Sequence, residues 1–332
     1  MRIVLDAMGS DTHPDPEIEG AVEAAKRFGD EIILVGNKEQ LKPKLEICKG
    51  GEKIKLVHAP EVLEMTDKPA RSARGKAENS MAVGMDLVKS GEGDAFVTAG
   101  NTGGAMANSL FRLGRIRGVK RPALTGIFPV QGGQCVVLDI GANADCKPEY
   151  LAQFALMGSL YAEKIRNIQE PRVGLLSNGE EEGKGNELVK TTYSLLKASN
   201  LNFIGNVEPK EVYGGGVDVV VTDGFSGNVF LKTSEAVARF MTTLLKESLT
   251  SSVRTTIGAG LAKPAFDKLR GVMDSSEIGA VPLLGIDGLV FVGHGRSNAT
   301  AIVSAIGAAR RAIEAGLLEA VRTGIQDQKT NG

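Results

Sequence analysis

Short apolar runs alternate with amphipathic stretches along most of the chain. The valine-rich run Val217–Val221 is typical of a strand that is buried on both faces. Residues 229–249 then place apolar side chains at helical spacing. Because such strands and helices alternate repeatedly, the sequence predicts an α/β fold with a doubly wound, mostly parallel sheet.

The same periodicities predict the remaining elements. Expected strands cover residues 2–6, 31–35, 54–57, 94–98, 122–129, 134–139, 172–176, 202–204, 280–284 and 289–292. Expected helices cover residues 14–28, 39–47, 80–88, 104–113, 148–165, 186–198 and 299–320. Glycines at 132–133 and 288 predict two added antiparallel hairpins. We expect a long loop over 59–77, a frayed tail after Gly324, and one interleaved unit over 1–332 with two subdomains as the alternative.

Composition narrows the class of protein. Apolar residues make up 42% and charged residues 24% of the chain, which is ordinary for a globular protein. A net charge of −1 and the lack of tryptophan argue against nucleic-acid binding. The three cysteines lack metal-site spacing, and residues 2–6 resemble a strand rather than a signal peptide. We therefore expect reduced thiols in a cytoplasmic protein without a membrane-spanning segment.

Glycine and asparagine recur just after five of the predicted strands. These loops are 99–104, 140–143, 177–186, 223–228 and 293–298. Glycines let backbone N–H groups approach a ligand, and a helix N-terminus adds partial positive charge. Since loops at the carboxyl ends of parallel strands line one crevice, we expect one shared anion site. The alternative is that these residues only cap helices and close turns.

The chemistry of these loops suits phosphate better than other ligands. No dinucleotide fingerprint, phosphate-binding loop of an NTPase or nucleophile elbow is present. Lysine, arginine, asparagine and loop amides can bind phosphate and stabilise an oxyanion. Acidic residues at 139, 145, 223 and 180–182 could bind a divalent metal, but we interpret them as caps and solvated charges. The sequence thus predicts neither a metal nor a cofactor.

A second feature is the apolar stretch 245–273. Leu245, Leu249, Val253, Ile257 and Leu261 recur every fourth residue, and the glycine-containing segment 255–260 is a poor helix centre. This pattern predicts a protruding amphipathic helical hairpin, with its tip at Val253, Ile257 and Leu261. Five cations and two anions between 244 and 273 give +3. Such a hairpin fits either an anionic membrane surface or packing within the core or a dimer.

Five motifs resemble those of the bacterial phosphate acyltransferases of phospholipid synthesis. They are Asp6–Asp11 (DAMGSD), Thr98–Gly103 (TAGNTG), Leu138–Asn143 (LDIGAN), Thr222–Asn228 (TDGFSGN) and Gly293–Ser297 (GHGRS). The resemblance implies transfer of a fatty acyl group from acyl-[acyl-carrier-protein] to inorganic phosphate, giving acyl phosphate. It also implies an isocitrate/isopropylmalate dehydrogenase-like fold and a homodimer. Peripheral association with the inner face of the cell membrane, near a membrane glycerol-3-phosphate acyltransferase, is implied as well.

Together, the loops and the resemblance give a hypothesis for the site. Phosphate is expected among the loops at Asn101, Asn143, Lys184 and Asn228. Lys184 offsets its charge, and either loop amides or Asn228 donate to the thioester oxyanion. His294, the third predicted catalytic residue, borders the same crevice. Predicted substrate-binding residues are Ser10, Asn101, Thr102, Gly103, Asp139, Asn143, Asp223, Ser226, Gly227 and Arg296.

The carrier protein is acidic in this family, so a basic rim is expected around the site. Two clusters are candidates: Arg71, Arg74 and Lys76, or Arg112, Arg115, Arg117, Lys120 and Arg121. Either cluster can also be an ordinary solvated face. Three other functions stay open: an acetyl- or butyryl-coenzyme A phosphotransferase, a metal- and NAD-dependent β-decarboxylating dehydrogenase, and a non-catalytic membrane scaffold.

Overall fold

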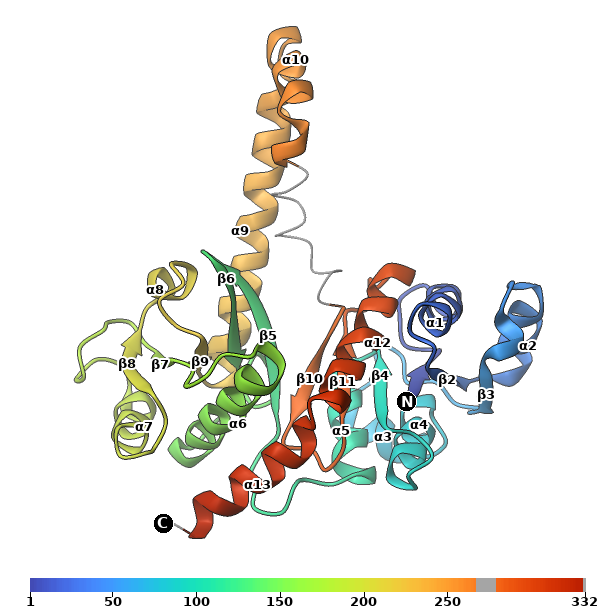
Figure 1. Ribbon diagram of the computed structural model, residues 1–332, viewed down its shortest axis with the longest axis horizontal. Helices are drawn as coiled ribbons and strands as arrows, with labels where there is room; N and C mark the ends of the chain where they lie inside the picture. The colour runs from blue at the N-terminus through green and yellow to red at the C-terminus, as the bar shows by residue number, and fades with distance from the viewer. Residues whose placement is uncertain (267–278, 331–332) are drawn as a thin grey trace.

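A single mixed sheet organises the computed structural model, which describes residues 1–266 and 279–330 (Figure 1). Its eleven described strands follow the order β3-β2-β1-β4-β11-β10-β5-β6-β9-β7-β8. One half contains β1 (Arg2–Asp6), β2 (Glu31–Gly36), β3 (Lys55–His58), β4 (Ala95–Thr98), β10 (Ala280–Leu284) and β11 (Val290–Gly293). The other half contains β5 (Ala123–Val130), β6 (Gly133–Leu138), β7 (Val173–Leu176), β8 (Phe203–Val207) and β9 (Val219–Val221). The mostly parallel α/β sheet and both predicted hairpins are confirmed.

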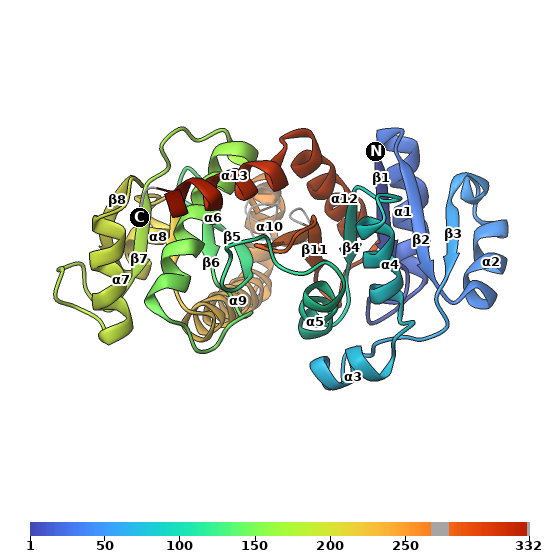
Figure 2. The same cartoon turned by 90° about the horizontal axis from the view of Figure 1, so that it is seen from below.

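Helices cover both faces of this sheet, as the prediction of a doubly wound fold requires. In Figure 2, α6 (Pro148–Arg166), α12 (Ala299–Glu314) and α13 (Leu317–Thr330) lie along one face, and α5 (Thr102–Arg112) and α9 (Gly224–Thr250) along the other. The remaining helices are α1 (Asp15–Phe28), α2 (Lys38–Ile47), α3 (Pro69–Gly75), α4 (Ser80–Lys89), α7 (Glu187–Lys197), α8 (Pro209–Tyr213) and α10 (Val253–Leu261). Alternate residues of β1 enter different cores: Ile3 joins one hydrophobic cluster and Val4 the other. Burial on both faces explains why these strands are continuously apolar.

Strand direction reverses across the middle of the sheet. Strands β3-β2-β1-β4-β11 are mutually parallel, and so are β6-β9-β7-β8. Between these groups lie three antiparallel pairings: β11 with β10, β10 with β5, and β5 with β6. The two parallel groups therefore run in opposite directions, and their carboxyl ends emerge at opposite edges of the sheet. The expectation that all five glycine-asparagine loops leave one edge is wrong, because the two hairpins invert the second group.

Several predicted boundaries also change. Helix α9 begins at Gly224 rather than near 229, because the Asp223 carboxylate accepts the backbone N–H of Ser226 at 2.8 Å and caps the helix. The expected loop 59–77 contains the short helix α3. The expected helix 299–320 is divided at Gly316, whose φ of 62° favours glycine. The tail forms α13 and buries Ile325 instead of fraying, since α13 packs on α6.

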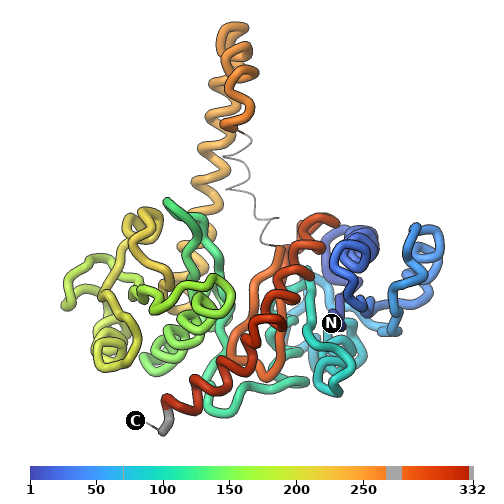
Figure 3. Tube along the Cα trace, in the orientation of Figure 1, coloured from blue at the N-terminus to red at the C-terminus, as the bar shows by residue number. Residues whose placement is uncertain are grey.

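Helices α9 and α10 form an arm that extends away from the sheet (Figures 1 and 3). With 27 residues, α9 is about 40 Å long. The chain turns at Ser251–Ser252, where Ser252 caps α10, so the glycine-containing segment 255–260 is helical and is not the turn that was expected. Val253, Ile257 and Leu261 are 77%, 62% and 82% exposed. Residues 267–273 of the predicted hairpin lie outside the described residues, and none of the described helices is long and apolar enough to span a membrane.

Candidate active site

The N-terminus of α9 and the loop after β6 form one compact cluster. The Gly224 N–H donates to the Asn143 carbonyl at 2.8 Å, and the Asn228 amide donates to the Ile140 carbonyl at 2.9 Å. A side chain at Gly227 would overlap the carbonyl oxygen of Asp139, so only glycine allows this approach. The structure therefore brings together the predicted residues of loops 139–143 and 223–228.

Asp139 holds this cluster from within. One carboxylate oxygen accepts the backbone N–H groups of Leu124, Gly141 and Ala142 at 2.9–3.1 Å. The other accepts the backbone and side-chain N–H groups of Asn143 at 2.7 and 2.9 Å. Burial raises the pKa of this carboxyl above its ordinary value, while the N–H groups around it lower the pKa. Both oxygens of Asp139 therefore already accept hydrogen bonds that fix the conformation of loop 139–143.

The loops after β1, β4 and β11 form a second cluster. The Asp11 N–H donates to the Gly295 carbonyl at 2.7 Å, which joins the first loop to the third. The Asn101 amide donates to the Met65 carbonyl at 3.0 Å, and its oxygen accepts the Gly104 N–H at 2.9 Å. Asn101 is thus the N-cap of α5. The exposed Thr102 and its neighbour Gly103 begin that helix, where N–H groups have no helical acceptor.

Two buried carboxylates accept hydrogen bonds from the loops of this second cluster. Asp6 accepts the Thr98 hydroxyl at 2.7 Å, and Thr98 in turn accepts the Gly100 N–H at 3.0 Å. Glu17 accepts the Ser10 N–H at 2.9 Å. Ser10 is buried, so its side chain does not reach the surface where a substrate would bind. Its predicted role as a substrate ligand is therefore left to the exposed residues of the same loop.

His294 and Arg296 belong to the second cluster, and the charges of Lys232 and Glu235 on α9 reach His294. His294 and Arg296 are exposed and lie side by side, with 3.5 Å between the Arg296 guanidinium and the His294 Nε2 atom. Neighbouring protein atoms partly shield the His294 ring from water, which lowers its pKa below the ordinary value, and the positive charges of Arg296 and of Lys232 on α9 lower the pKa further. The imidazole is therefore neutral at pH 7 and can accept a proton. Lys232 stands one helical turn beyond Asn228, so α9 connects the two clusters.

Lys184 lies in a third loop, outside both clusters. Its backbone N–H donates to the Glu181 carbonyl at 2.9 Å, and its exposed side chain lies against Gly179. Asn206 on β8 holds the same loop by donating to Glu181 at 2.9 Å. In the described part of the chain, no hydrogen bond or ion pair joins this loop to either cluster. The five loops thus form two clusters and one separate loop rather than a single ring.

Several of these loop asparagines cap helices, which was the alternative to ligand binding that the sequence left open. Asn101, Asn186, Asp223 and Asn298 are the N-caps of α5, α7, α9 and α12, each accepting a backbone N–H group. Capping is therefore a confirmed role for these side chains. Asn228 differs because it lies inside the first turns of α9, is exposed, and donates to Ile140 instead of capping.

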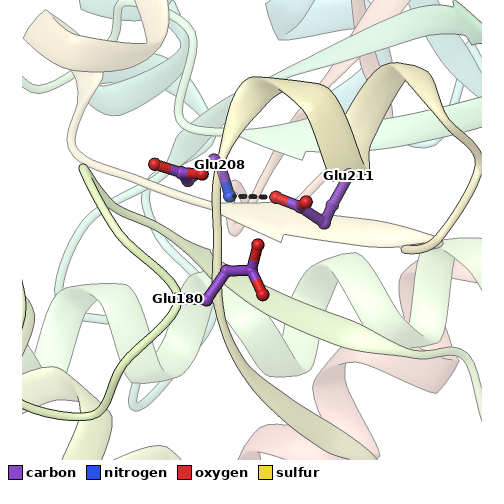
Figure 4. A group of neighbouring side chains, drawn as sticks. All are labelled: Glu180, Glu208 and Glu211. Atoms are coloured by element: carbon purple, nitrogen blue, oxygen red, sulfur yellow. Dashed lines mark hydrogen bonds between the residues drawn. The ribbon is translucent and has the colours of Figure 1, made fainter.

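Three carboxylates gather near the third loop: Glu180, Glu208 and Glu211 (Figure 4). Their oxygens lie within 4.8 Å of one another, a spacing that could suit a cation. The Lys210 ammonium already lies 2.8, 2.9 and 3.5 Å from them, and these partners raise its pKa above the ordinary value. This group is therefore an ion-pair network around Lys210.

The protein-family model described as "Fatty acid synthesis protein" matches residues 1–320. The chain belongs to this family. A phosphate acyltransferase from Pelotomaculum thermopropionicum is 46% identical over 332 residues, covering 100% of this chain and 97% of that protein. A phosphate acyltransferase from Elusimicrobium minutum is 45% identical over 334 residues, covering 99% and 97%.

Solved structures that resemble the chain share its fold at low sequence identity. A phosphotransacetylase from Streptococcus pyogenes superimposes with a TM-score of 0.60 at 18% identity, covering 94% of each chain. A putative 4-hydroxythreonine-4-phosphate dehydrogenase from Salmonella typhimurium gives 0.55 at 12%, covering 93% and 98%. At such identities the likeness establishes the α/β fold alone.

Sequence reasoning missed two parts of this family member's site. Lys232 was hidden within a regular helix, although its position four residues after Asn228 was a usable signal. Asp6 begins one of the family motifs and Glu17 lies in none of them, but nothing in the sequence showed that folding buries both carboxylates under the loops. The three cysteines are free, as predicted. Burial raises the pKa of Cys146 beside Asn143 to about 11, so this thiol is not a ready nucleophile.

Proposed function

We propose that this protein transfers a fatty acyl group from acyl-[acyl-carrier-protein] to inorganic phosphate, producing acyl phosphate for phospholipid synthesis. The observation that carries the proposal is 46% identity over the full chain to a phosphate acyltransferase. In the reaction, a phosphate oxygen attacks the thioester carbonyl carbon. The carbon–sulfur bond then breaks, and the carrier's thiolate leaves. Such a step needs positioning and charge stabilisation more than a strong protein nucleophile.

The two clusters supply groups for this step. We propose that phosphate binds at the first turn of α5, at the N–H groups of Thr102 and Gly103, with Arg296 offsetting its charge. Asn228 uses its second amide hydrogen for the thioester oxyanion. Neutral His294 accepts the proton that hydrogen phosphate loses as it attacks. Exposure of Arg296 and Asn228 and the lowered pKa of His294 support these roles. Ser226 and Asp223 keep the α9 terminus in shape through a 2.8 Å hydrogen bond.

Arg296 and Lys184 provide the tests that accompany the assay of function. The parent protein, given an acyl-carrier-protein thioester and phosphate, should form a product that hydroxylamine traps as a hydroxamate. Arg296→Ala should raise the KM for phosphate roughly tenfold, the value of one charged hydrogen bond. Lys184→Ala, in the separate loop, should leave this KM near the parental value, and a tenfold rise would instead place Lys184 at the phosphate. Lys190→Ala, at another exposed lysine close in sequence, is the matched control.

Four results would contradict these proposals. Unchanged phosphate dependence in Arg296→Ala would remove Arg296 from the phosphate site. Turnover confined to acetyl- or butyryl-coenzyme A would favour the phosphotransferase alternative, and NAD reduction with a 2-hydroxy acid would favour the dehydrogenase. Vesicle binding without thioester loss would favour a scaffold.

We also propose a cytoplasmic homodimer of single interleaved units, with the isocitrate/isopropylmalate dehydrogenase-like arrangement that the sequence resemblance implies. The arm supports association with a second copy, because Val237, Phe240 and Met241 are 54–63% exposed along α9. Its end supports peripheral contact with the inner face of the cell membrane. Acyl phosphate released there would reach a membrane glycerol-3-phosphate acyltransferase.

The membrane proposal predicts a selective loss in Ile257→Asp/Leu261→Asp. Each buried apolar side chain contributes about 1.5–3 kcal/mol, so binding to anionic phospholipid vesicles should weaken at least about tenfold. Acyl phosphate formation in solution should persist. Thr256→Asp adds a charge at an exposed polar position of the same helix and should bind vesicles more strongly than the double variant. Parental vesicle binding by the double variant would exclude contact through these residues.

A further inference from the structure

A basic surface runs along α5, from its first turn near Pro69 to its last turn at Phe111. We call it the α3 patch: Lys68, Arg71 and Arg74, together with Phe111 of α5. Helix α3 packs against α5, and a Cβ added to Gly103 would lie 2.6 Å from the Cγ atom of Pro69. The patch is thus joined to the turn where we place phosphate, and Figure 2 shows α3 next to α5.

Few carboxylates neutralise the cations of the α3 patch. Lys68 and Arg71 are exposed and form no ion pair within the described residues. Arg74 instead lies 5.1 Å from the ring centroid of Phe111, which is itself 46% exposed. Residues 64–76 contain four cations and two anions, which gives +2 in a chain whose net charge is −1. The surface is therefore locally positive, with an exposed aromatic side chain beside Arg74.

The second basic cluster, residues 112–121, differs in its connections. Arg112 is paired with Asp86 at 2.9 Å, and the Arg115 guanidinium donates to the Lys120 carbonyl. Arg115 also pairs through its backbone with Ile286, between β10 and β11. That turn lies at the opposite end of β11 from His294, so Arg115 is remote from the second site cluster.

We propose that the α3 patch docks an acidic face of the acyl carrier protein that presents the thioester. This inference rests on the proposed function, which requires such a carrier to deliver its acyl group near α5. Uncompensated cations steer an acidic partner and fix its orientation, while an exposed aromatic ring beside arginine is typical of an interface anchor. In Figure 1 the patch lies on the body of the molecule, far from the end of the arm.

The test is charge reversal in the complete protein, Arg71→Glu/Arg74→Glu. The KM for acyl-[acyl-carrier-protein] should rise at least about tenfold with little change in kcat, and its dependence on salt should flatten, because steering is lost. Fluorescence anisotropy of labelled carrier protein should show the same weakening. Arg71→Lys/Arg74→Lys should restore most of the binding, since charge is kept.

Arg117→Glu/Arg121→Glu is the matched control, because both arginines are exposed in the other basic cluster. A larger effect in this control, or an unchanged KM in the α3 variant, would overturn the proposal. Loss of vesicle binding or a change in oligomeric mass with an unchanged KM would reassign the patch to lipid or to a second copy. A parent that binds the carrier but forms no acyl phosphate would refute the proposed function while leaving the docking surface testable by anisotropy.

Discussion

Replacing Gly227 with alanine is expected to remove most of the activity and part of the stability. The added methyl group would overlap the backbone carbonyl of Asp139, and backbone cannot rotate away as a flexible side chain can. Helix α9 must then shift, at a cost of about 1–3 kcal/mol. A displacement near 1 Å at a reacting group can cost roughly 100-fold in rate. Asn228, the adjacent residue, would move with the helix.

The measurements are thermal unfolding and hydroxamate formation by parent and variant. Gly258→Ala is a matched control, because it lies in α10 and a Cβ there meets no atom within 4 Å. It should be neutral or stabilise α10 by up to about 1 kcal/mol through helix propensity. Parental melting and turnover in Gly227→Ala would mean that α9 does not need its close contact with Asp139.

Asp139→Ala is expected to be the most destabilising of these substitutions. It removes a buried carboxylate that accepts four backbone N–H groups and one amide, and leaves those donors without acceptors. Hydrogen bonds to a charged group each contribute about 1.5–3 kcal/mol, so a net loss of about 3–5 kcal/mol is expected after partial relaxation. Loop 139–143 also accepts hydrogen bonds from Gly224 and Asn228 at the start of α9. Because these contacts would weaken, acyl phosphate formation should fall as well.

Denaturant unfolding measures this loss directly. Asp145→Ala serves as the control, since Asp145 is exposed in the following turn and should change stability by less than about 0.5 kcal/mol. Asp139→Asn should fall between the two, because its amide nitrogen would face the donors of Asn143. Equal unfolding midpoints for the alanine variants at 139 and 145 would show that the carboxylate does not hold the loop.

The sequence by itself determined the local elements. Val219–Val221 is continuously apolar because both faces of its strand are buried, and adjacent residues alone show this burial. Asn101 and Asp223 mark helix starts because capping involves residues only two or three positions apart. The motifs likewise indicated the family. Boundaries were missed where glycines weakened the helical pattern, as in the first turn of α9.

Only the tertiary structure decided how the loops are grouped. The inserted hairpins reverse the second set of parallel strands, and no local pattern records which distant strands pair or in which direction. For the same reason Lys232 and His294 come from segments remote in sequence, yet one charge influences the other's pKa. Local periodicity reports burial and capping, whereas the site depends on long-range pairing that exists only after the chain has folded.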